Sequence, residues 1–205
     1  MSEFGGSRPA FVALGDSYTI GTAVAERDRW PNQLVDRLSA GASLRLVANL
    51  GMNGYTSADV IREELPRLST YRPGFASLLV GVNDVVQGVP ADRYRTNVVV
   101  ILDRLLAVLR PVRILAVSTP DYTVTPQGAR FGDPVSQSAG IRRNNEILAA
   151  LAADRSIAFV DILDLSLLAA DDRSLVADDG LHPSGRQYAL WADRIAPVVK
   201  ELLAG

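Results

Sequence analysis

The sequence predicts an α/β fold in which a five-stranded parallel sheet is covered by helices on both faces. Short apolar runs bounded by turn residues alternate along the chain with longer segments of helical periodicity. The apolar runs contain almost no polar residue, which is typical of strands that are buried on both faces. A length of 205 residues, with 48% hydrophobic and 21% charged residues and no cysteine, predicts one folded domain over 9–205 after a flexible N-terminal segment over 1–8.

The strands are expected where the apolar runs lie. In chain order they are Ala10–Leu14, Leu44–Ala48, Phe75–Val80, Val112–Val117 and Ile157–Val160. We expect the strand order 2-1-3-4-5 that is common in flavodoxin-like sheets, which places the first strand between the second and the third. Ligands bind such sheets outside the carboxyl ends of the strands, so the residues just after each run are the candidates for function.

The helices follow from apolar stripes that repeat every three to four residues. The clearest stripe runs from Tyr94 to Leu109 and ends before Pro111. A cap formed by Thr56 and Asp59 opens another helix, which runs toward Pro66. The other expected helices are a short one from Trp30 to Leu38, one over 138–153 and one over 184–203 with a kink at Pro197.

The segment 119–139 has no sustained periodicity and contains three prolines and two glycines. A loop of this length in a compact domain is usually functional or mobile. We therefore expect it to lie over the active face.

The charge pattern excludes two classes of partner. The net charge is −2, and the basic and acidic residues are interspersed, so no one-sided basic patch is available for nucleic acid or for anionic lipid. No run approaches the roughly 20 apolar residues that span a bilayer, and the N-terminus has no signal-peptide pattern. We expect a cytoplasmic protein that binds neither nucleic acid nor membranes, whose oligomeric state the sequence does not define.

Unusual residues follow the first three strands. They are Gly15-Asp16-Ser17-Tyr18, the segment 49–55 and Gly81-Val82-Asn83-Asp84. In the expected strand order Ser17 is flanked by Gly54 and Asn83. The backbone N–H groups of Ser17 and Gly54 and the amide of Asn83 could then converge on one oxyanion, which acyl transfer requires.

A serine hydroxyl needs an adjacent base, and the chain has a single histidine, His182. It lies in Asp178-Asp179-Gly180-Leu181-His182, where Gly180 permits a tight turn. This turn can bring the carboxylate of Asp179 to the imidazole, where it would fix the tautomer and stabilise the imidazolium. Asp178 is the competing candidate for that role.

Four sequence blocks closely resemble those of the SGNH hydrolases, the GDSL-type esterases and lipases. The blocks are Gly15-Asp16-Ser17, Gly54, Gly81-Val82-Asn83-Asp84 and Asp179-Gly180-Leu181-His182-Pro183, and they occur in the family order from residue 15 to residue 183. The resemblance implies a three-layer α/β/α fold and Ser17 as the nucleophile. It also implies an oxyanion hole of Ser17, Gly54 and Asn83, and a triad completed by Asp179 and His182.

The chain departs from the family pattern at one position, because Tyr18 follows the serine where the family name has leucine. Gly51 competes with Gly54 for the second block, but Asn53-Gly54-Tyr55-Thr56 is the better match to a loop that leads into a capped helix. The GxSxG elbow of ordinary α/β-hydrolases is absent, and the order of serine, aspartate and histidine fits the SGNH layout.

Other residues near these blocks admit a structural and a functional interpretation. Asp16 and Asp84 could bind a metal, but with one histidine and no cysteine we expect them to orient the catalytic loops, and we predict no metal. Trp30 and Trp191 are expected in the core. Four aromatic residues could either line a pocket or pack the helices, namely Tyr18, Tyr55, Tyr122 and Phe131.

The sequence thus predicts a serine esterase that hydrolyses small carboxylic esters through an acyl-enzyme and needs no cofactor. Activity should fall on acidification, because the neutral imidazole is the working base. No lid-like insertion is visible, which favours short acyl chains. The alternative is a flavodoxin-like module whose Ser17-Tyr18-Thr19 loop holds the phosphate of a flavin or nucleotide. Such a site gives no reason for Asp179-Gly180-Leu181-His182.

Overall fold

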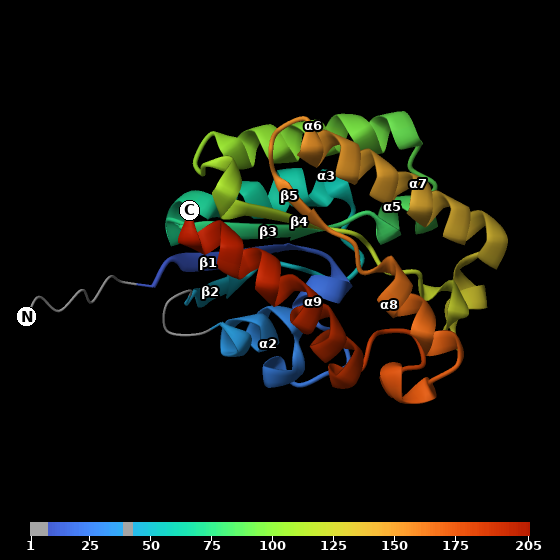
Figure 1. The fold of residues 1–205 in the computed structure, drawn as a ribbon. Coiled ribbons are helices and arrows are strands. Elements are labelled where there is room, and N and C mark those ends of the chain that lie inside the picture. The colour runs from blue at the N-terminus through green and yellow to red at the C-terminus, as the bar shows by residue number, and fades with distance from the viewer. Residues whose placement is uncertain (1–7, 39–42) are drawn as a thin grey trace, which may run out of the picture.

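The apolar runs form one parallel sheet at the centre of the computed structural model, which describes residues 8–38 and 43–205 (Figure 1). The flexible segment predicted over 1–8 therefore lies outside the described residues except for Arg8. The strand order β2-β1-β3-β4-β5 confirms the predicted order. The strands are β1 Ala10–Gly15, β2 Arg45–Asn49, β3 Phe75–Leu79, β4 Ile114–Val117 and β5 Ala158–Val160.

The α-helices surround this sheet. They are α1 Ser17–Ile20, α2 Trp30–Arg37, α3 Ser57–Asp59, α4 Leu68–Tyr71, α5 Val82–Val86, α6 Ala91–Leu106, α7 Pro134–Ala153, α8 Leu163–Leu167 and α9 Gly185–Ala204. Within the described parts of the chain, none of them is long and apolar enough to cross a membrane. Ser184 caps α9 by accepting the backbone N–H of Gln187, and this helix continues through Pro197.

The irregular stretch over 119–139 is shorter than predicted. The side chain of Asp133 accepts a hydrogen bond from the backbone of Ser136, and Pro134 occupies the first turn, so α7 begins at residue 134 instead of 138. The loop itself contains two 3₁₀ turns, at Tyr122–Val124 and Gly128–Phe131. A capping residue followed by proline was the sequence signal for this helix start.

The fourth strand and the helix that opens at Thr56 also differ from the prediction. The fourth strand begins at Ile114, because Pro111–Arg113 form a 3₁₀ turn before it. The helix that opens at Thr56 has the expected capping box, but it continues as a π turn at Val60–Glu64 and a 3₁₀ turn before α4. Pro66 lies in that 3₁₀ turn and has no N–H for a regular α-helical bond, which accounts for the change of helix type.

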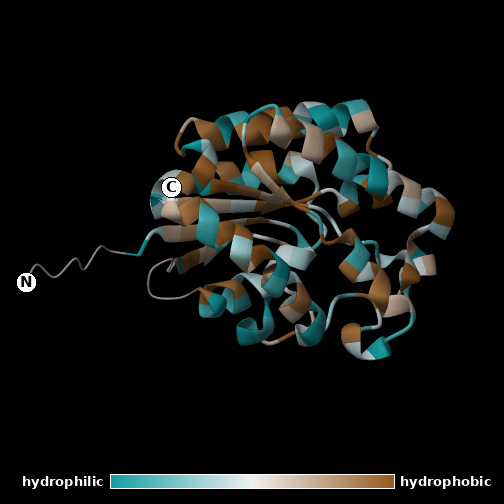
Figure 2. Cartoon of the chain, viewed as in Figure 1, coloured by the Kyte–Doolittle hydropathy of each residue, from teal (hydrophilic) through white to brown (hydrophobic). Residues whose placement is uncertain are grey.

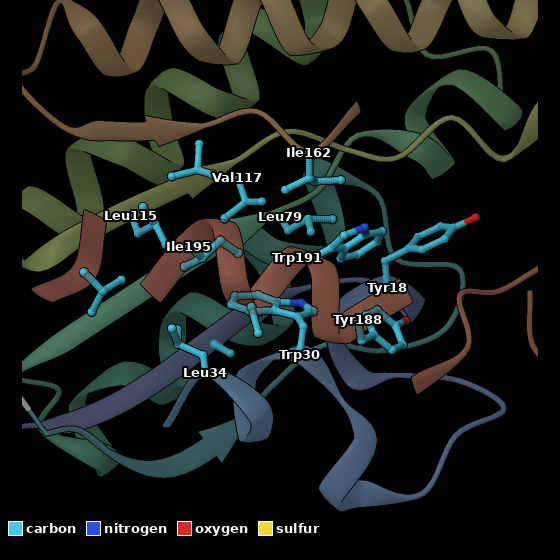
Figure 3. Packing of buried hydrophobic residues seen from close by; sticks show 14 of the residues in the cluster. Tyr18, Trp30, Leu34, Leu79, Leu115, Val117, Ile162, Tyr188, Trp191 and Ile195 are labelled. Carbon is cyan, nitrogen blue, oxygen red and sulfur yellow. The ribbon is translucent and has the colours of Figure 1, made fainter. Parts of the chain in front are cut away.

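Alternate strand residues point to opposite faces of the sheet, which creates two hydrophobic cores. Phe11 packs in one core under α2 and α9, where Trp30 and Trp191 are fully buried as predicted (Figure 3). Val12 packs in the other core under α6 and α7. Apolar residues accordingly fill the sheet and the inner helix faces, while hydrophilic residues lie on the outer faces (Figure 2). The sheet is a rigid base whose carboxyl edge carries the loops described next.

Candidate active site

Ser17 lies in a tight turn between β1 and α1. Gly15 ends the strand at φ +151°, and a Cβ on it would lie 2.1 Å from the carbonyl oxygen of Leu79, so the turn requires glycine. The side chain of Asp16 caps α1 by accepting the backbone N–H of Tyr18 at 2.9 Å. Ser17 is the first residue of α1, so its backbone N–H has no acceptor within the helix and is available to a ligand. Because the turn follows β1 directly, the side chain of Ser17 lies at the carboxyl end of that strand.

Gly54 lies in a turn of the segment that follows β2. The N–H of Tyr55 donates to the carbonyl of Met52 at 3.2 Å, and Gly54 adopts φ +79°, which a type II turn requires at its third residue. Gly51 has a different task, because a Cβ on it would lie 2.7 Å from the carbonyl oxygen of Asp16. Gly51 therefore allows close packing against the serine turn, and Gly54 faces the cavity.

Asn83 belongs to α5, just after β3. Its Nδ2 donates to the carbonyl of Tyr55 at 2.9 Å, which ties this helix to the turn that contains Gly54. Gln87 adds a second link, because its Nε2 donates to the carbonyl of Gly54 at 3.0 Å. An asparagine amide has two hydrogens to donate, so Asn83 can serve a ligand with the second one.

Asp84, also on α5, joins this helix to the start of α3 from inside the protein. Its carboxylate accepts the backbone N–H of Ser57 at 2.9 Å and the hydroxyl of Ser57 at 2.5 Å. Asn97 on α6 donates to that hydroxyl oxygen at 2.9 Å. Burial raises the pKa of Asp84 even though both bonds from Ser57 act to lower it. The predicted orienting role of Asp84 corresponds to this network.

His182 and Asp179 form a hydrogen-bonded pair just before α9. Oδ2 of Asp179 lies 2.6 Å from Nδ1 of His182, and Oδ1 accepts the backbone N–H groups of Leu181 and His182 at 2.9 Å. Gly180 makes this turn possible at φ +72°. Burial acts to raise the pKa of Asp179, but the hydrogen bonds from His182 and Leu181 outweigh it and hold that pKa below its usual range. Asp179, and not Asp178, is thus the residue that contacts the imidazole.

These segments meet at one cavity of about 220 Å³. Its polar lining consists of Ser17, Asn53, Gly54, Asn83 and His182. Its apolar lining consists of Tyr18, Val82, Val86, Tyr122, Phe131 and Leu181. The structure therefore brings together four of the five predicted site residues at the cavity surface, with Asp179 bonded to His182.

The aromatic candidates divide between pocket and core. Tyr122 and Phe131 both line the cavity and pack edge to face, with ring centroids 5.8 Å apart. Both come from the 119–133 segment, which thus forms one cavity wall as expected. The N–H of Gln127 in this segment donates to the carbonyl of Gly180 at 2.9 Å, which links the wall to the turn before His182.

The other two aromatic candidates differ from each other. Tyr55 is absent from the described cavity lining, while Tyr18 both lines the cavity and packs in the core.

Two buried carboxyl groups lie under the serine turn. Asp16 is fully buried, and burial, with a smaller contribution from the charge of Asp84, raises its pKa to about 7 despite the bond from Tyr18. Glu64 is also fully buried, and its Oε2 accepts the backbone N–H of Gly15 at 2.9 Å. Asp16 stands out in the sequence beside Ser17, whereas Glu64 does not, because a glutamate in a helical segment is usually exposed.

Four further residues line the cavity without having been assigned a role from the sequence, namely Asn53, Val82, Val86 and Leu181. Three of them stand inside the predicted sequence blocks, and Val86 alone lies outside them. Across residues 8–38 and 43–205, no group of three or more His, Cys, Asp or Glu side chains could hold a metal ion.

Comparison with known proteins identifies the family. The family model described as the GDSL-like lipase/acylhydrolase family matches residues 13–190, a range that contains every predicted site residue. Among curated proteins, no sequence matches the chain.

Solved structures share the fold. Esterase EstA from Pseudoalteromonas sp. superposes with a TM-score of 0.72 at 20% identity, covering 96% of this chain and 100% of that one. A member of the lipolytic protein G-D-S-L family from Veillonella parvula gives 0.73 at 19% identity, covering 92% and 97%. An acetyl xylan esterase from Geobacillus stearothermophilus gives 0.71 at 17% identity, covering 93% and 94%. Because the family model covers most of the sequence, the chain belongs to the GDSL-like lipase/acylhydrolase family and is a carboxylic ester hydrolase.

Proposed function

We propose that the protein hydrolyses short-chain carboxylic esters through an acyl-enzyme on Ser17, with His182 as the base and Asp179 as its partner. The observation that carries this proposal is the 2.6 Å contact between Asp179 and Nδ1 of His182, beside the cavity that Ser17 also lines. A carboxylate on Nδ1 favours the tautomer in which Nε2 is free to accept a proton.

In the first half of the proposed reaction, Nε2 of His182 takes the proton of the Ser17 hydroxyl while Oγ attacks the ester carbonyl. The negative charge that develops on the carbonyl oxygen is stabilised by the N–H groups of Ser17 and Gly54 and by the amide of Asn83. One such donor is typically worth about 2.7–4 kcal/mol in the transition state. The tetrahedral intermediate then collapses, and His182 returns the proton to the leaving alcohol.

In the second half, His182 removes a proton from water, and the resulting hydroxide attacks the acyl group on Ser17. Collapse of this second intermediate releases the carboxylic acid and restores the hydroxyl of Ser17 with the proton from His182. In the complete reaction, one ester and one water are consumed, and one alcohol and one carboxylic acid are formed. The proposed reaction therefore requires no cofactor.

The size of the cavity supports a short acyl chain. Its volume of about 220 Å³ is below the roughly 300–1,000 Å³ of pockets that enclose drug-sized ligands. The likeness to an acetyl xylan esterase is in line with a small acyl group.

The test compares the wild-type protein with Ser17→Ala on p-nitrophenyl esters from acetate to octanoate. We expect hydrolysis that is fastest for the shortest chains and that is lost in Ser17→Ala. Ser69→Ala is the matched control, because Ser69 is exposed on α4. A reactive alkylphosphonate should label the peptide that contains Ser17. Equal rates for wild type and Ser17→Ala, or a flavin spectrum without hydrolysis, would overturn the proposal.

A further inference from the structure

We propose that Glu64 is a positioning residue that holds the turn carrying Ser17 through the backbone N–H of Gly15. The inference rests on the proposed role of Ser17 as the nucleophile. It concerns a residue that contacts neither the cavity nor His182 and that acts through the backbone two positions before the serine.

The contact joins distant parts of the chain. Oε2 of Glu64 accepts the N–H of Gly15 at 2.9 Å across a separation of 49 residues, and the glutamate side chain is fully buried. Glu64 is the last residue of the π turn that follows α3. Single π turns inside helices are often found at functional sites, because they displace one side chain from the regular helical position.

The end of β1 explains why this N–H needs a side-chain partner. The N–H of Leu50 donates to the carbonyl of Ala13, and in a parallel ladder the N–H of Gly15 would next donate to a carbonyl of the neighbouring chain. The chain beyond β2 instead turns at Gly51 to pack against the serine turn. The carboxyl group of Glu64 occupies the place of the missing carbonyl, and an unpaired buried N–H is thereby avoided.

The surroundings of Glu64 favour its uncharged form. Burial and the nearby carboxyls of Asp16 and Asp59 raise the pKa of Glu64 to about 9, although Gly15 and Arg67 act in the opposite direction. Within the described residues, Oε1 of Glu64 and Oδ2 of Asp16 are buried without a hydrogen-bond partner. A neutral side chain of the same shape therefore suits this place, and glutamine is the conservative replacement.

Two variants separate positioning from a purely structural role. Glu64→Gln keeps an oxygen that can accept the N–H of Gly15, whereas Glu64→Leu removes it. The matched control is Glu63→Leu, the same substitution at the neighbouring glutamate, whose side chain is 48% exposed. Each protein is assayed for kcat and KM on p-nitrophenyl acetate, for its melting temperature, and for exchange of the Gly15 amide by NMR.

We expect Glu64→Leu to lower kcat by at least about tenfold with KM changed less than about twofold, well below its melting temperature. Glu64→Gln should keep kcat within about threefold of wild type. The Gly15 amide should exchange faster in Glu64→Leu alone. An unchanged kcat in Glu64→Leu with a lowered melting temperature, or an equal loss of kcat in both variants, overturns the proposal.

If Glu64→Leu does not fold, Glu64→Met replaces it, because methionine fills irregular space and also lacks an acceptor of comparable strength. The outcome for the proposed function remains distinguishable. If wild type hydrolyses no ester, the esterase proposal fails, while Gly15 amide exchange still reports whether Glu64 holds the turn. Unchanged exchange in both Glu64→Leu and Glu64→Met then overturns the present inference.

Discussion

The ring of Tyr18 lies 5.3 Å from the imidazole of His182, with the two planes inclined by 50°. Tyr18 follows Ser17 directly, is only 3% exposed and lies at the edge of the cluster around Trp191, with its hydroxyl pointing away from that cluster (Figure 3). The imidazole is therefore held by the carboxylate of Asp179 and by an aromatic ring from the helix that begins at Ser17. Tyr18 stands where the letters G-D-S-L of the family name place a leucine, and in this chain it contacts the proposed base through its ring.

Removing this ring should impair the base. Aromatic pairs contribute about 0.5–1.5 kcal/mol beyond the area that they bury, so Tyr18→Ala should lower kcat on p-nitrophenyl acetate by up to about tenfold. Tyr18→Phe keeps the ring and should stay within about twofold of wild type. The two variants are compared by steady-state kinetics after their folding has been checked by circular dichroism. A large loss in Tyr18→Phe would instead assign the effect to the hydroxyl.

Asp179 and Asp178 offer a neighbouring pair for testing the partner of the base. Asp179→Asn changes the hydrogen bond on Nδ1 of His182 and favours the wrong tautomer, which lowers kcat by about four orders of magnitude in serine-histidine-aspartate enzymes. We expect a loss of several orders of magnitude here. Asp178 is exposed, so Asp178→Asn should leave kcat unchanged. Equal activity of the two variants would remove Asp179 from the proposed mechanism.

Phe131 should limit the length of the acyl chain. It lines the cavity, rests edge to face on Tyr122 and is 40% exposed, so truncation opens the wall with little effect on the core. Phe131→Ala should raise the ratio of kcat/KM for octanoate to that for acetate by about tenfold. The control is Val135→Ala on α7, which is 78% exposed and outside the cavity lining. An unchanged ratio in Phe131→Ala would place the acyl chain elsewhere.

Glu64 should make the protein less stable as the pH rises. Burial, with a contribution from Asp16, raises the pKa of Glu64 from 4.5 to about 9. Between these values the native state keeps the proton while the unfolded chain loses it. The free energy of unfolding therefore falls with increasing pH, by at most about 1.4 kcal/mol per pH unit.

Glu64→Gln cannot titrate, so its stability relative to wild type should increase between about pH 5 and about pH 8. Urea denaturation at several pH values measures this difference. The control is Glu63→Gln, the same substitution at a neighbouring side chain that is 48% exposed. A pH-independent difference for Glu64→Gln would contradict the expected protonation of Glu64 in the native state.

Local patterns in the sequence were sufficient to predict the sheet and to select most residues of the candidate site. The apolar runs are continuous, so the strands could be predicted, and their order is the one that is common in flavodoxin-like sheets. The site residues sit at strand ends and in turns that require glycine, such as Gly54 and Gly180. The start of α7 was placed too late, since the cap at Asp133 was treated as part of a loop rich in proline and glycine.

The remaining features depend on contacts between distant segments. Glu64 has no local feature that distinguishes it from an exposed helical glutamate, and its burial follows from the position of β1. Tyr18 could be noticed as an aromatic residue, but its contact with His182 requires the fold that brings residues 18 and 182 together.

The hydrogen bond from the N–H of Gln127 to the carbonyl of Gly180 joins the wall that carries Phe131 to the turn that precedes His182. Evolution or protein engineering that exchanges the 119–133 segment for another sequence would therefore change more than the shape of the cavity. A transplanted segment with proline at this point, or with its backbone displaced, would lose this hydrogen bond, so a change of substrate range would also alter the support of the histidine turn.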